Sequence, residues 1–72
     1  MSNEIKICTA DMILTDAIED YSRITGQSID SIRDAIIESG AYDALYDFDT
    51  GLWAQGPDYF IDFFLKKSKA NN

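Results

Sequence analysis

The sequence predicts an all-α fold, a compact bundle of three main helices plus one short helix, joined by short glycine-containing turns. Three observations support this prediction. Apolar residues recur at intervals of three and four along most of the chain. Gly26 and Gly40 stand where two of these patterns end, as glycine commonly does after a helix. The alternation of apolar and polar residues that is typical of strands is limited to residues 5–7.

The first helix is expected over about Asn3–Thr25. At 100° per residue, a main apolar stripe falls on one side of this helix. Its members are Ile7, Ala10, Leu14, Ala17 and Tyr21, flanked by Ile13, Ile18 and Ile24. The alternative start is a short strand over residues 5–8, followed by a helix capped at Thr9.

A second apolar stripe, formed by Ile5, Cys8 and Met12, lies roughly opposite the main one. A helix with two apolar faces is either covered on both sides within the fold or presents one face to a partner. The second stripe is therefore a candidate dimer face, and burial by the last helix is the alternative. Cys8 has no base near it in the sequence, so we expect a thiol that only packs.

The second helix is expected to begin after Ser28, a good N-cap, with Asp30 in its first turn, and to end at Gly40. Its apolar stripe comprises Ile29, Ile32, Ala35 and Ile36. A short third helix is expected over residues 41–48, where Ala41, Leu45 and Phe48 have helical spacing.

Residues 51–56 form a predicted loop that carries Leu52 and Trp53, and Pro57 suits the first position of the last helix. This helix is expected to run to about Lys67. Its wide apolar arc predicts burial on most sides, at the centre of the core. The arc comprises Tyr59, Phe60, Phe63 and Phe64, with Ile61 and Leu65 adjoining. We expect one domain over residues 1–68 and a disordered tail over 69–72.

The composition excludes several classes of function. The chain has 72 residues, a net charge of −7, no histidine and one cysteine, so imidazole catalysis, histidine-containing zinc sites and internal disulfides are ruled out. The acidic balance opposes direct nucleic-acid binding. No signal peptide or membrane-spanning run is recognisable, and a lone cysteine fits a cytoplasmic protein. We expect no cofactor, no metal and no enzymatic activity.

The acidic residues are concentrated in one half of the chain. Residues 34–65 contain seven acidic residues and no basic one, and eight of the nine aromatic residues follow Gly40. Three interpretations are open: a solvated face, a surface that docks on a basic partner protein, and mimicry of a nucleic-acid backbone. The aromatic side chains could build the core or serve as partner contacts. The predicted partner contacts are Asp43, Tyr46, Asp47, Asp49 and Trp53.

Three more specific interpretations fail on the residues themselves. A calcium loop beginning at Asp47 would have Gly51 at its fifth position and Leu52 at its sixth, where Asp or Asn and then Gly are required. A helix-turn-helix would present an acidic recognition helix to DNA phosphates. The pair Asp43 and Asp47 could be proposed as acid and base, but no nucleophile lies beside them.

Residues 44–48 (ALYDF), 52–56 (LWAQG) and 59–61 (YFI), with Gly26, Ser28 and Gly40, resemble a family of short bacterial proteins of unknown function. Members of this family are often encoded beside a suspected toxin that resembles ADP-ribosyltransferases, and they are suspected antitoxins. Trp53 stands where the family pattern has histidine, so no role of that histidine carries over. The resemblance implies a helical, cytoplasmic, partner-binding protein.

From these observations we expect a small acidic protein-binding module, antitoxin-like, whose partner is a more basic protein, with a homodimer as a further option. The alternative is a nucleic-acid-mimicking inhibitor of a nuclease or of a restriction- or CRISPR-type enzyme. The two differ in whether nucleic acid competes for the same partner surface.

Overall fold

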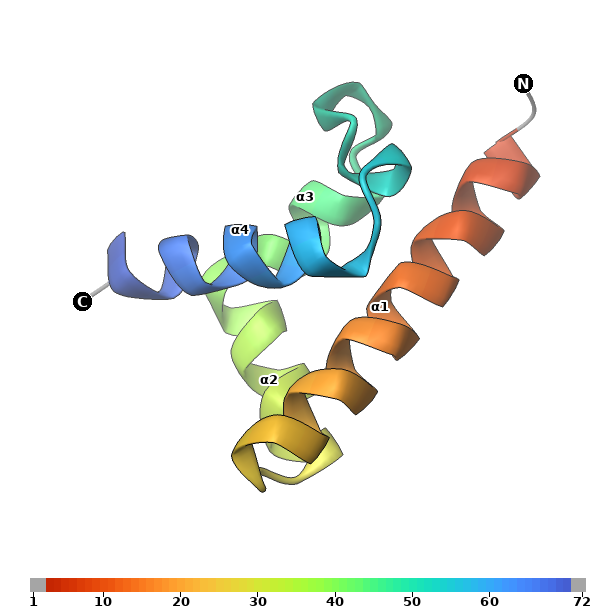
Figure 1. Cartoon of the computed structure of the whole chain (residues 1–72). Helices are drawn as coiled ribbons and strands as arrows, with labels where there is room; N and C mark the ends of the chain where they lie inside the picture. The colour runs from red at the N-terminus through yellow and green to blue at the C-terminus, as the bar shows by residue number, and fades with distance from the viewer. Residues whose placement is uncertain (1–2, 71–72) are drawn as a thin grey trace.

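The computed structural model describes residues 3–70 as an all-α bundle, in agreement with the predicted class. Its elements are α1 (Asn3–Thr25), α2 (Ile29–Ser39), α3 (Ala41–Tyr46), the 3-10 turns η1 (Phe48–Thr50) and η2 (Leu52–Ala54), and α4 (Pro57–Ala70). Helix α1 forms one long side of the molecule, α2 turns back from its C-terminal end, and α4 starts beside α1 and runs away from it past α2 and α3 (Figure 1). The alternative strand over residues 5–8 is wrong, because these residues are helical.

The turns between the first three helices follow from their sequence. Gly26 adopts a left-handed conformation, and its N–H donates to the carbonyl of Ser22 (2.8 Å). The Ser28 hydroxyl accepts the N–H of Ser31 (3.1 Å), which caps α2 as expected. Gly40, with φ 86°, ends α2 and starts α3, a conformation that is strained for a residue with a side chain.

The core draws side chains from every helix. Phe60 of α4, Ile32 of α2 and Leu45 of α3 are the largest side chains that are almost completely buried. The other buried apolar residues are Ala10, Ile13, Ala17, Ile18, Ile36, Ala41, Leu52 and Phe64. No helix within residues 3–70 combines the length and apolar character that crossing a membrane requires.

The predicted burial of the apolar residues on the first and last helices is only partly confirmed. Ile7 is 43% exposed, and Ile24 is 78% exposed because it lies beyond Ile18, the last buried residue of α1. Helix α4 does not bury most of its sides. Phe60 and Phe64 are buried, whereas Tyr59 is 54% exposed, because the other helices cover only one face of α4.

Three predicted boundaries also change. Helix α3 ends at Tyr46 rather than at residue 48, since Asp47 has an extended backbone (φ −88°, ψ 99°). The predicted loop over residues 51–56 contains η2. Helix α4 continues to Ala70, so residues 69 and 70 are helical rather than part of the predicted disordered tail. The rest of that tail, residues 71–72, lies outside the described residues, as do residues 1–2 of the predicted domain.

Candidate functional site

The five predicted partner contacts lie in one continuous segment, residues 41–56, which we call the acidic loop segment. Its backbone is held by its own polar groups. The carboxylate of Asp47 accepts the N–H of Asp49 (3.2 Å) and so caps η1. The Thr50 hydroxyl lies 2.8 Å from the carbonyl oxygen of Ala44, and it accepts the N–H of Leu52 (3.2 Å). These bonds, with Leu52 buried beneath them, give the segment a defined shape.

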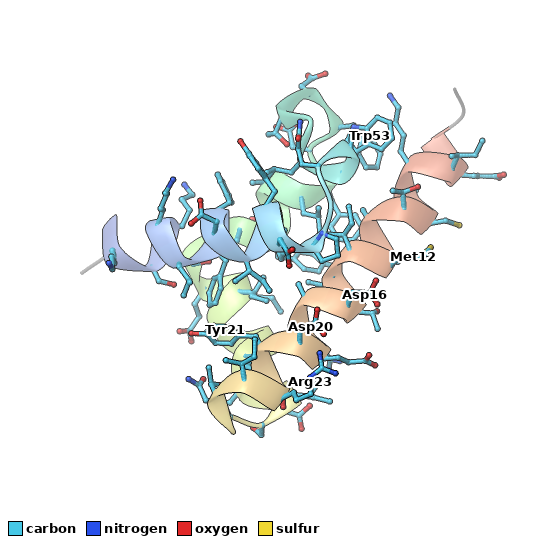
Figure 2. All side chains as sticks on the ribbon, viewed as in Figure 1. Met12, Asp16, Asp20, Tyr21, Arg23 and Trp53 are labelled. Carbon is cyan, nitrogen blue, oxygen red and sulfur yellow. The ribbon has the colours of Figure 1, made fainter. Side chains whose placement is uncertain are left out.

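Trp53, in η2 of this segment, is half-buried beside the start of α1 (Figure 2). Its indole N–H donates to the carbonyl of Phe48 (3.3 Å), and the two rings meet edge to face with centroids 6.5 Å apart. The ammonium of Lys6, from α1, lies 5.4 Å from the centroid of the Trp53 ring and 5.7 Å from that of Phe48. The structure thus surrounds Trp53 with contacts from its own chain, rather than leaving it fully exposed on a loop.

Tyr46 links the same segment to α1 at a second point. Its hydroxyl donates a hydrogen bond to the carboxylate of Asp11. The centroid of its ring lies 4.8 Å from the centroid of the Tyr42 ring. Burial raises the pKa of Tyr46 above its usual value of 10.0. This pKa is raised further by the hydrogen bond to Asp11, by the negative charge of Asp11 and by the nearby Tyr42, because all three favour the neutral phenol.

The carboxylates of Asp43, Asp47 and Asp49 are exposed. Among residues 3–70, the ion pairs join Arg23 to Asp20, Arg33 to Asp30, and Lys66 to Asp62, each within a single helix. None of these pairs involves a carboxylate of the acidic loop segment. Within the described residues, the cation that lies at this segment is therefore Lys6, which contacts the rings of Phe48 and Trp53 and forms no ion pair with the carboxylates.

The second stripe of α1 is exposed. Met12 is 66% and Ile5 54% exposed, and Cys8 is a free, exposed thiol. Figure 2 shows Met12 on the side of α1 that faces away from the other helices. The alternative in which the last helix buries this stripe is therefore wrong, since α4 packs on the opposite side. Cys8 does not pack inside this chain either, because its side chain is exposed.

The arrangement offers little for metal or small-molecule chemistry. Across residues 3–70, no three histidine, cysteine or acidic side chains gather as a metal site, and the carboxylate of Asp47 is used as a cap. A cavity of about 190 Å³ lies between α1 and α2, away from the acidic loop segment, and it is lined by Leu14, Thr15, Ile18, Glu19, Ile29 and Arg33. A larger one, of about 360 Å³, lies along the C-terminal half of α4 and is lined by Asp62, Leu65, Lys66, Ser68 and Lys69. The larger one reaches the size of ligand pockets, which start at about 300 Å³, but all of its lining residues come from a single helix.

The structure therefore divides the five predicted contacts by role. Asp43 and Asp49 present free carboxylates, Asp47 shapes the backbone, and Tyr46 and Trp53 are partly committed to α1. Two further residues of α1, Lys6 and Asp11, meet this segment and are not among the predicted contacts. In the sequence both residues are only recognisable as members of the first helix, before Ile13. A place on a helix does not identify an aromatic partner that is more than 30 residues away in the sequence.

Comparisons with protein-family models, with curated proteins and with solved structures found no match to this chain. The resemblance to a family of suspected antitoxins therefore stays an expectation.

Proposed function

We propose that this chain is a small, non-enzymatic protein-binding module, an antitoxin-like neutraliser of a cognate bacterial protein. The observation that supports the proposal is the acidic loop segment, in which exposed carboxylates without ion-pair partners stand on a backbone fixed by internal hydrogen bonds. A basic surface on the partner would complement this charge, and the complex would block the partner's active cleft.

Charge and order act at different stages of such binding. Unpaired carboxylates accelerate the encounter with a basic protein and select against acidic ones. A segment that is already ordered loses less conformational entropy on binding than a flexible loop does. The half-buried rings of Tyr46 and Trp53 add apolar area to the same segment, as aromatic residues do at many interfaces.

The absence of catalysis is part of the proposal. A nucleophile would need a neighbouring base. The one thiol, Cys8, lies on the exposed stripe of α1, whereas the acid and base candidates Asp43 and Asp47 lie on the acidic loop segment. We place the module in the cytoplasm, because a free surface thiol is typical of a reducing compartment.

Copurification tests the proposal. The tagged chain is expressed together with the product of the neighbouring gene, and a stable complex is expected on size exclusion. The matched control is the same tagged chain with Asp43→Lys and Asp49→Lys, which should lose the complex while keeping its helical circular dichroism. If the wild-type chain binds no neighbouring gene product, the antitoxin-like proposal is wrong.

The second candidate is a nucleic-acid-mimicking inhibitor of a nuclease or of a restriction- or CRISPR-type enzyme. It is favoured by the exposed carboxylates that continue onto α2, at Asp34 and Glu38, also without ion-pair partners among the described residues. A mimic competes with DNA for its enzyme, and salt strongly weakens that competition. Inhibition that does not change with salt would contradict this candidate.

A further inference from the structure

We propose that the ring pair of Phe48 and Trp53 is a binding site for a lysine side chain of the partner protein, and that Lys6 occupies this site in the free chain. The inference rests on the proposed function and names the chemical group that the partner would insert. It also implies that partner binding exchanges one ammonium group for another at the same place.

The geometry is that of a two-walled aromatic site for a cation. The rings of Phe48 and Trp53 are nearly perpendicular, at 77°, and the ammonium of Lys6 lies within 6 Å of both centroids. Aromatic faces attract ammonium groups through the ring quadrupole at this distance, and tryptophan does so most strongly. An ammonium group that already occupies the site shows that its size and charge are suitable.

The surrounding charges favour a cation and disfavour an anion. Asp47 and Asp49 stand on either side of Phe48 in the sequence, and both are exposed. Neither forms an ion pair among the described residues, so their negative charge adds to that of the ring faces. A lysine that approaches from a basic partner would enter a negative local potential.

The walls of the site do not depend on Lys6. The indole of Trp53 is oriented by its hydrogen bond to the carbonyl of Phe48, and η2 is anchored by the buried Leu52. Lys6 itself is a half-buried residue in the second turn of α1, on a long flexible stem, and none of the ion pairs involves it. A single cation–π contact of a partly exposed lysine is weak, so a second ammonium can replace it.

The test uses the free chain and tetramethylammonium chloride as the probe, with sodium chloride keeping the ionic strength constant. Trp53 is the one tryptophan, so its indole N–H signal in NMR reports on the site without ambiguity. We expect a saturable shift of this signal in the wild type. In Lys6→Met, which keeps an apolar stem, the probe should bind roughly three- to ten-fold more tightly, because the internal competitor is gone.

Two controls make the result specific. Lys66→Met removes a lysine that is ion-paired within α4 and should leave the affinity for the probe unchanged. Phe48→Leu removes one wall and should abolish the saturable shift, while Trp53 still reports. Equal probe affinity in the wild type and Lys6→Met, or no saturation in a folded Lys6→Met, would overturn the proposal.

A readout on the wild type covers the case in which Lys6→Met does not fold. The side-chain carbon signals of Lys6 should move away from their ring-shifted positions as the probe saturates Trp53. Lys6 signals that stay unchanged at saturation would overturn the proposal. No partner is present in these experiments, so their failure leaves the copurification result standing, and a failed copurification leaves these results standing.

Discussion

Asp43 and Asp47 carry the same charge one helical turn apart, yet the structure gives them different roles. Asp47 accepts a backbone hydrogen bond that starts η1, whereas Asp43 is exposed on α3. Tyr46, between them, is held by Asp11 of α1. At the scale of single residues, stability and binding are therefore separable within the same short segment.

The first prediction compares the two acids. Asp47→Ala should lower the free energy of unfolding by about 0.5–2 kcal/mol, because the first backbone donor of η1 loses its cap. Asp43→Ala, the matched control, should change it by less than about 0.5 kcal/mol. Urea denaturation followed by circular dichroism measures both. An equal loss in the two variants would mean that the cap does not stabilise the segment.

The second prediction concerns pH. The raised pKa of Tyr46 means that the folded chain keeps the phenol proton at a pH where the unfolded chain loses it. Its contribution to stability is complete below pH 10, the usual pKa, and is lost as the pH rises above that value. Tyr46→Phe should cost about 0.5–1.5 kcal/mol near neutral pH, through the lost hydrogen bond to Asp11.

The check is a set of denaturation curves for both proteins at several pH values. The difference in unfolding free energy between wild type and Tyr46→Phe should stay constant up to about pH 10 and shrink above it. A difference that grows in alkaline solution would contradict the assignment of the hydroxyl as a donor to Asp11.

At the scale of elements, local signals were enough to predict most helices. Ser28, Gly40 and Pro57 mark helix ends through capping geometry that depends on a few neighbouring residues. The early end of α3 was missed, because the helical spacing of Phe48 continues past it, while the carboxylate of Asp47 bonds to the backbone and turns the chain. The exposure of Tyr59 depends on which helices pack on α4, and spacing alone does not contain that information.

The third prediction tests the start of α2. Ser28→Ala should cost about 1 kcal/mol, because the N–H of Ser31 loses its acceptor. Ser31→Ala serves as the control: it keeps that N–H, its side chain is exposed, and alanine is the better helix former, so stability should change by less than about 0.5 kcal/mol. Chemical denaturation measures the free energy of unfolding of both variants. A Ser28→Ala protein as stable as the wild type would contradict a stabilising role of this cap.

The fourth prediction tests the exposed stripe of α1. If Ile5, Cys8 and Met12 form a dimer face, the wild type should sediment as a dimer, and Met12→Asp should yield monomers with unchanged circular dichroism. Glu19→Gln on the same helix, which removes an exposed charge, is the control and should keep the dimer. A wild type that is monomeric at high concentration, or a Met12→Asp protein that still dimerises, rules out this face.

At the scale of the whole molecule, the net charge of −7 has a definite distribution. Three basic side chains pair with acids of their own helix, and Lys6 and Lys67 lie over aromatic rings. The carboxylates of the acidic loop segment take part in none of the ion pairs of the described residues. The sequence indicates where acids and aromatic residues are concentrated, but not that α1 reaches back to Tyr46 and Trp53, since these contacts arise only when the helices pack.

The central claim is that the acidic loop segment is the surface that binds a basic protein, and the dissociation constant of the purified complex tests it most directly. Asp43→Asn with Asp49→Asn is compared with Asp34→Asn and Glu38→Gln on α2, which change the net charge equally. The segment variant should bind about ten-fold or more weakly at low salt, with a smaller difference at high salt, and the α2 variant should bind nearly as the wild type does. Equal weakening in both variants, or wild-type affinity in the segment variant, would contradict the claim.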